Sequence, residues 1–239
     1  MVEQSVRRAV IVSHGQPSDP APAEAELAIL AQEVAACLPD WQIGSATLAS
    51  PDDFTRAVKG GPGLIYPLFM SGGWFTATHL PDRLAAAGAA NWQILAPFGL
   101  DPRVQALTVL LAKEACFGRP SAEVLLAAHG SFRSPAPSEV AYDMLRQLRL
   151  SGIAKAEAGF IDQTPRIAEI AQGFGPAAVC LPFFAAKGGH VIDDLPAALA
   201  ATNFSGKLLA PVGADPRVPG LIALALQSAS DYSATADIR

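Results

Sequence analysis

The stretches that decide the fold are two short apolar runs, AVIVSHG at residues 9–15 and VLLAAHG at residues 124–130. Each run ends in a His-Gly pair, and each is apolar at successive positions, as in a strand buried on both faces of a parallel sheet. The two runs lie 115 residues apart, far beyond the period of a solenoid repeat. The chain is therefore expected to be a duplicated α/β protein.

Further segments repeat at nearly the same offset. YPLFMSGGWFTATHLPDRL at residues 66–84 matches LPFFAAKGGHVIDDLPAAL at 181–199, and LAPFGLDPRV at 95–104 matches LAPVGADPRV at 209–218. These matches show that the duplication extends through most of the chain.

The alternation of apolar runs with Ala- and Leu-rich stretches predicts a βαβαβαβα order in each half. The expected strands are 9–13, 42–48, 64–69, 93–97, 124–128, 156–161, 178–183 and 207–211. The expected helices are 22–38, 53–59, 80–87, 102–115, 137–150, 165–173, 191–200 and 216–228. We expect two pseudo-symmetric, doubly wound parallel-sheet lobes at residues 1–116 and 123–239, with a central cleft and a joint at 117–123.

Composition narrows the functional classes. The net charge is −5 and no basic run is present, so nucleic acid is not an expected partner. No apolar run approaches the roughly 20 residues that span a bilayer, so no membrane partner is expected either. MVEQSVRR lacks a secretory pattern, and Cys37, Cys116 and Cys180 are widely spaced without a CxxC motif. These features predict a cytoplasmic protein with reduced thiols.

The histidines are the main indication of function. The chain has four, and His14, His79, His129 and His190 all fall in the duplicated segments, at or just after the expected carboxyl end of a strand. Ligands bind at that edge of an open parallel sheet. Imidazole binds divalent metals and exchanges protons near neutral pH, so the pattern favours metal or proton chemistry.

Two segments of the second half carry the strongest signals. AAHGSFRSPAPSE places His129 before a turn at Gly130, and LPFFAAKGGHVIDDLP places His190 after Gly188 and Gly189. Each has a purely structural alternative, namely a strand-end histidine bonded to backbone and a plain loop before a helix with acidic first-turn residues. The duplication favours function for His129.

HGS, PxFxxxGGHVxxDLP and PxGxDPRV, in this order, resemble the class II tetrapyrrole chelatases. The chain is most similar to the long, duplicated sirohydrochlorin chelatases of the CbiX type. The resemblance implies a chelatase-like fold and ATP-independent insertion of Co²⁺ or Fe²⁺ into sirohydrochlorin, for cobalamin or sirohaem synthesis. It implies His129 and His190 as metal ligands and proton acceptors, with the metal as a substrate and no organic cofactor.

The reaction indicates roles for neighbouring residues. Asp162 matches an acidic position of the family and is expected to accept a proton or orient a histidine, with a helix N-cap as the alternative. The substrate's carboxylates need donors, for which Ser131, Arg133 and Lys187 are candidates. Gly188 and Gly189 would let the backbone approach the macrocycle closely.

The first half departs from the pattern. HGS becomes HGQ, GGH becomes GGW with Trp74 at the aligned position, and His79 follows five residues later. We expect this half to have lost metal binding and to offer Trp74, Phe75 and Phe69 for stacking on the macrocycle. The alternative is a displaced second site made by His14 and His79.

Other functions remain open at this stage. A histidine phosphatase would carry RHG, but Ser13 and Ala128 precede the two HG pairs. A non-catalytic tetrapyrrole or metal carrier, or a chelatase for another tetrapyrrole or for Ni²⁺, fits the same histidines. A duplicated chain is compatible with a monomer or a homodimer.

Overall fold

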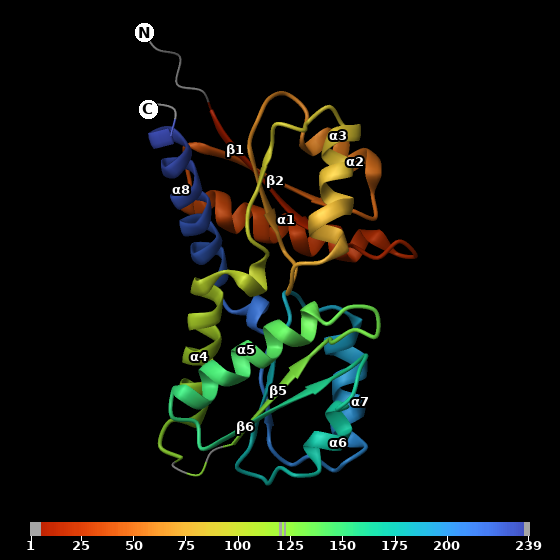
Figure 1. The fold of residues 1–239 in the computed structure, drawn as a ribbon, viewed down its shortest axis with the longest axis vertical. Coiled ribbons are helices and arrows are strands. Elements are labelled where there is room, and N and C mark those ends of the chain that lie inside the picture. Colours follow the sequence, from red (N-terminus) through yellow and green to blue (C-terminus); the bar gives the residue numbers. More distant parts are fainter. Residues whose placement is uncertain (1–5, 120, 122, 237–239) are drawn as a thin grey trace. The chain divides into compact units, whose positions relative to one another are not determined.

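The computed structural model describes residues 6–119, 121 and 123–236, which form two parallel four-stranded sheets with flanking helices (Figure 1). Of the expected joint at 117–123, Pro120 and Ala122 lie outside the described residues. The two sheets confirm the α/β class expected from the duplicated apolar runs. Within the described ranges, no helix has the length and apolar character needed to cross a membrane.

The first sheet has the order β2-β1-β3-β4. Its strands are β1 (Arg7–Ser13), β2 (Trp41–Thr47), β3 (Leu64–Pro67) and β4 (Gln93–Ile94). The helices of this half of the sequence are α1 (Pro20–Cys37), α2 (Pro51–Ala57), α3 (Leu80–Ala86) and α4 (Pro102–Cys116). Side chains of β1 alternate between the two faces, and Val10 and Val12 pack with Phe54 of α2 and Leu84 of α3.

The second sheet repeats this order as β6-β5-β7-β8. Its strands are β5 (Glu123–Ala128), β6 (Lys155–Phe160), β7 (Val179–Pro182) and β8 (Lys207–Leu208). The helices are α5 (Ala136–Leu150), α6 (Ile167–Ala171), α7 (Leu195–Ala200) and α8 (Val218–Ala236). Leu125 and Ala127 pack on α6 and α7, while α4 and α5 lie against the other face of the sheet (Figure 1).

The compact units divide the chain differently from the expected lobes. One unit comprises residues 1–98 and 216–239, and the other comprises residues 99–215. The reason is the packing of the last helix of each half: α4 contacts α5 and β7, whereas α8 contacts α1 and β3. The duplicated halves of the sequence thus exchange their final helices.

Most element boundaries agree with the sequence expectations to within a few residues. The strands β3, β4, β7 and β8 are shorter than expected, and the β3–β4 and β7–β8 ladders each contain only two residue pairs. The first part of the helix expected at 191–200 is a π-helical turn, His190–Asp194, which precedes α7, and α3 is preceded by the corresponding turn Phe75–His79. π-Helical turns are rare in proteins, and those that occur are often found at functional sites.

Candidate metal-insertion site

The second sheet brings three loops to one edge. In the order β6-β5-β7-β8, the chain moves to one side after β5 and to the other after β6, so the switch point lies between β5 and β7. His129 directly follows β5, Asp162 lies two residues after β6, and His190 follows the loop after β7. This is the edge at which open α/β sheets bind ligands.

The two histidines meet at this edge although 61 positions separate them. Their Nε2 atoms are 3.0 Å apart, and their rings are nearly perpendicular, with an interplanar angle of 86°. The sequence predicted both residues, and the structure brings them into direct contact.

The tautomer of each ring follows from its second nitrogen. His129 Nδ1 lies 2.7 Å from the carbonyl oxygen of Gly130, which can only accept, so Nδ1 carries the hydrogen. His190 Nδ1 lies 2.6 Å from Oδ2 of Asp194, and an ionised carboxylate likewise only accepts. In their neutral forms both rings therefore direct an Nε2 lone pair toward the same point.

Two facing lone pairs repel one another unless a proton or a cation lies between them. With metal–nitrogen bonds of about 2.0–2.1 Å, nitrogens 3.0 Å apart would subtend roughly 90–95° at a shared ion, a usual angle for divalent metals. No group of three or more His, Cys, Asp or Glu side chains is arranged as metal ligands among the described residues. The arrangement suits an ion that is held by few protein ligands and can be released.

Two carboxylates, Asp162 and Asp194, form a polar cluster with His129 and His190. Asp162 Oδ2 is 3.7 Å from His129 Nδ1, too far for a hydrogen bond but within ion-pair distance. It does not cap a helix, because α6 begins at Ile167 with Arg166 at its N-cap. The four side chains are 41–53% exposed, so metal and protons can exchange with solvent.

Asp194 is the site residue that the sequence reading assigned no role. The signal was present, since Asp194 follows His190 by four positions and residues at that spacing share a helical face. The π-helical turn brings the pair within hydrogen-bond distance.

The other expected residues lie around this cluster in different ways. The Ser131 hydroxyl accepts a hydrogen bond from the backbone N–H of Arg133, whose side chain is exposed. Lys187, Gly188 and Gly189 are exposed in the loop before His190, and a Cβ at Gly188 would meet nothing within 4 Å. The fold therefore leaves open space over Gly188.

The equivalent turn of the first sheet shows that the expected alignment of Trp74 with His190 is wrong. Gly73 accepts hydrogen bonds from the N–H groups of Thr76 and Ala77, just as Gly188 accepts them from Val191 and Ile192. This register pairs Phe75, not Trp74, with His190, and His79 with Asp194. The sequence alignment was off by one because it matched Gly72-Gly73 to Gly188-Gly189.

Aromatic contacts replace the polar ones in this cluster. His14 lies edge-on to Phe75, with ring centroids 4.4 Å apart, where His129 meets His190. Trp74 is 60% exposed and stacks on His79 at 4.7 Å. Ala49 occupies the position of Asp162, since its N–H donates to His14 as that of Asp162 donates to His129. The first cluster thus lacks the second imidazole and both carboxylates at their equivalent positions.

Comparison with known proteins identifies the family. A solved structure of CbiX, described as the terminal enzyme for biosynthesis of sirohaem in denitrifying bacteria, is 47% identical, with a TM-score of 0.86. The match covers 93% of this chain and 99% of that one. The chain belongs to the CbiX family. The CbiX family model matches residues 123–229, which include all four residues of the polar cluster. No curated protein matches the chain.

Two more distant structures share the CbiX fold. SirB from Bacillus subtilis with Fe³⁺ is 17% identical, with a TM-score of 0.71, and the match covers 92% of this chain and 94% of that one. The sirohydrochlorin chelatase SirB from Bacillus subtilis subspecies spizizenii, in complex with cobalt, is 16% identical with a TM-score of 0.67 over the same shares. These likenesses support the fold.

Proposed function

We propose that this protein inserts a divalent metal ion into sirohydrochlorin without ATP, for the synthesis of sirohaem or cobalamin. The observation that carries the proposal is the pair of Nε2 atoms 3.0 Å apart, each ring anchored through its Nδ1. Membership of the CbiX family and the 47% identity to a sirohaem-pathway enzyme support the substrate. The metal is a substrate, and Co²⁺ or Fe²⁺ suits imidazole ligands.

The reaction exchanges one divalent ion for two pyrrole protons, so the site needs ligands that are also bases. His129 and His190 offer their Nε2 lone pairs first to the ion and, as the ion moves to the macrocycle, to the protons. Asp194 holds the orientation of His190, and Asp162 lies where its charge offsets the positive charge that His129 gains with a proton.

Substrate contacts form the second part of the proposal. The open space over Gly188 would admit the edge of the macrocycle beside the exposed Gly189, and Ser131, Arg133 and Lys187 would donate to its carboxylates. The indole of Trp74 is 60% exposed and is suited to stacking on a macrocycle face. The three free cysteines agree with a reducing cytoplasm.

An anaerobic insertion assay tests the function. Sirohydrochlorin is mixed with Co²⁺ or Fe²⁺, and absorbance is followed for wild type, His190→Ala and a control without protein. We expect acceleration by wild type alone, with His190→Ala folded but inactive. A spectral shift on mixing without faster insertion would instead support a carrier, and equal rates in all three would refute the chelatase proposal.

A further inference from the structure

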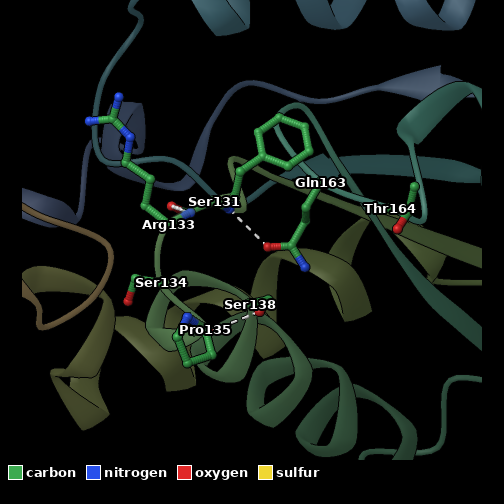
Figure 2. Close-up of a pocket in the computed structure, with 8 residues that line it drawn as sticks. Ser131, Arg133, Ser134, Pro135, Ser138, Gln163 and Thr164 are labelled. Carbon is green, nitrogen blue, oxygen red and sulfur yellow. Dashed lines mark hydrogen bonds between the residues drawn. The ribbon is translucent and has the colours of Figure 1, made fainter.

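Beside the histidine pair lies a cavity of about 430 Å³ that the metal chemistry does not use. It is formed by the loop after β5, the start of α5 and the loop after β6 (Figure 2). Ser131 of its wall is two residues from His129, so their Cα atoms are no more than about 7 Å apart. A ligand at the histidine pair could therefore reach into the cavity.

Gln163 presents a fixed donor to this cavity. The N–H of Ser131 donates to Gln163 Oε1 at 2.8 Å, which assigns the oxygen of the amide because a backbone N–H can only donate (Figure 2). Gly130, with φ of +70°, leaves room for the side chain, since a Cβ there would lie 2.6 Å from Gln163 Cγ. The NH₂ group of Gln163 has no hydrogen-bond partner in the described part of the chain.

Three hydroxyls add donors. Ser131 Oγ accepts from the N–H of Arg133, and Ser134 Oγ accepts from the N–H of Ala136, so each hydroxyl hydrogen remains uncommitted. The Thr164 hydroxyl also lacks a partner among the residues described. Ser138 differs, because its hydroxyl already donates to the Pro135 carbonyl.

The residues that line the cavity are neutral or positively charged. Arg133 belongs to the lining, although Figure 2 shows its guanidinium directed away from Gln163. Arg166 lies over the ring of Phe132, another lining residue, at 5.1 Å. The nearby carboxylates Asp162 and Glu139 do not line the cavity. A wall of uncommitted N–H and O–H donors complements an acceptor-only anion.

We infer that this cavity, with Gln163 as a principal donor in its wall, is a subsite that binds one carboxylate substituent of the tetrapyrrole. The inference rests on the proposed function for the identity of the ligand. A carboxylate fits because two oxygens can accept from the Gln163 NH₂ and from the hydroxyls together.

Gln163→Glu is the direct test. It retains an oxygen for the Ser131 N–H, removes the two amide donors and opposes a carboxylate with a carboxylate. Metal-free sirohydrochlorin is titrated by absorbance, and we expect its Kd and KM to rise about ten- to a hundredfold. The KM for Co²⁺ and kcat at saturating tetrapyrrole should stay near wild type. Gln172→Glu, exposed at the end of α6, is the control for the added charge.

A second variant and a second ligand test the subsite further. Thr164→Val removes a hydroxyl at constant volume and should raise Kd several-fold. Sirohydrochlorin methyl esters lack the charge but keep a carbonyl acceptor, so Gln163→Glu should lose much less affinity for the ester than for the free acid. Unchanged affinity of Gln163→Glu for the free acid, or an equal loss for acid and ester, would overturn the subsite.

These experiments distinguish a failure of the subsite proposal from a failure of the chelatase proposal. Loss of binding in Gln163→Glu, with no insertion by wild type, would retain the subsite and refute the chelatase. Insertion by wild type with unchanged binding in Gln163→Glu would do the reverse. Wild type that does not bind sirohydrochlorin at all would refute the subsite.

Discussion

At the scale of residues, each histidine of the polar cluster uses one nitrogen for anchoring and leaves the other for a ligand. The anchors differ, since His129 donates to a backbone carbonyl and His190 to the Asp194 carboxylate. Only the second anchor can be removed by substitution.

Asp194→Ala should therefore weaken Co²⁺ binding and insertion about ten- to a hundredfold, because His190 loses the partner that fixes its tautomer and orientation. Asp194→Asn, which can still accept from Nδ1, should recover part of the loss. Calorimetric titration with Co²⁺ and kcat measure both. Asp193→Asn, on the neighbouring position, is the control, and an equal effect there would assign the loss to net charge.

His14 and His190 form a second comparison. His14→Ala should leave most of the insertion rate, because His14 contacts Phe75 and not a second imidazole. His190→Ala should remove it. The anaerobic assay, with circular dichroism as the folding control, measures both, and comparable losses would contradict a site confined to the second sheet.

At the scale of elements, the turn Val212–Ala214 holds the loop that leads to His190. Gly213 donates its N–H to the Phe184 carbonyl at 2.9 Å, and a Cβ on it would lie 1.9 Å from the carbonyl oxygen of Ala185. The PxGxDPRV motif thus has a structural reason here, because only glycine permits this approach of two backbones.

Gly213→Ala should lower the free energy of unfolding by about 1–3 kcal/mol and reduce insertion, since the loop must move. Gly220→Ala, where a Cβ in α8 would meet nothing within 4 Å, should be neutral or slightly stabilising. Urea unfolding and the insertion assay measure both. A stable Gly213→Ala variant with normal activity would show that the contact does not position the loop.

Strand β7 also carries Cys180, whose thiol has a pKa raised by burial. Burial raises the pKa of Cys180 from 9.0 to about 12, because the thiolate cannot be solvated there. The folded pKa exceeds the unfolded one, so the stability contributed by the neutral thiol is complete below pH 9.0 and is lost as pH rises toward 12.

Wild type should consequently lose stability between pH 9 and 11 more steeply than Cys180→Ala, as measured by urea unfolding. At pH 8 a thiol reagent should modify the exposed Cys37 quickly and Cys180 only after denaturation. Parallel pH profiles for the two proteins would contradict the burial effect.

At the scale of the whole molecule, the chain carries one backbone design twice with different side chains. The π-helical turns Phe75–His79 and His190–Asp194 have matching hydrogen bonds, and the strand orders are the same. The first sheet therefore lacks the polar cluster because of three side chains: Ala49, Phe75 and His79.

The triple variant Ala49→Asp, Phe75→His and His79→Asp should restore a second metal site beside His14. We expect Co²⁺ stoichiometry, measured by equilibrium dialysis, to rise from one to two per chain. In the His190→Ala background it should rise by one as well. No increase would show that the backbone match at the first sheet is too loose to orient the ligands.

The sequence by itself determined the duplication, the parallel α/β class and the two histidines. These follow from local chemistry, since doubly buried strands must be apolar throughout and His129 and His190 end or follow such strands. It also placed Asp162 at the same edge, because the carboxyl ends of parallel strands lie together.

Only the tertiary structure decided the contacts across long separations. It set the 3.0 Å contact of His129 with His190, the pairing of Phe75 with His190 and the unit to which α4 and α8 belong. The physical reason is that a hydrogen-bonded turn and a packed helix depend on partners far along the chain. Two nearly identical segments, LAPFGLDPRV and LAPVGADPRV, contain no local signal that distinguishes one packing partner from the other.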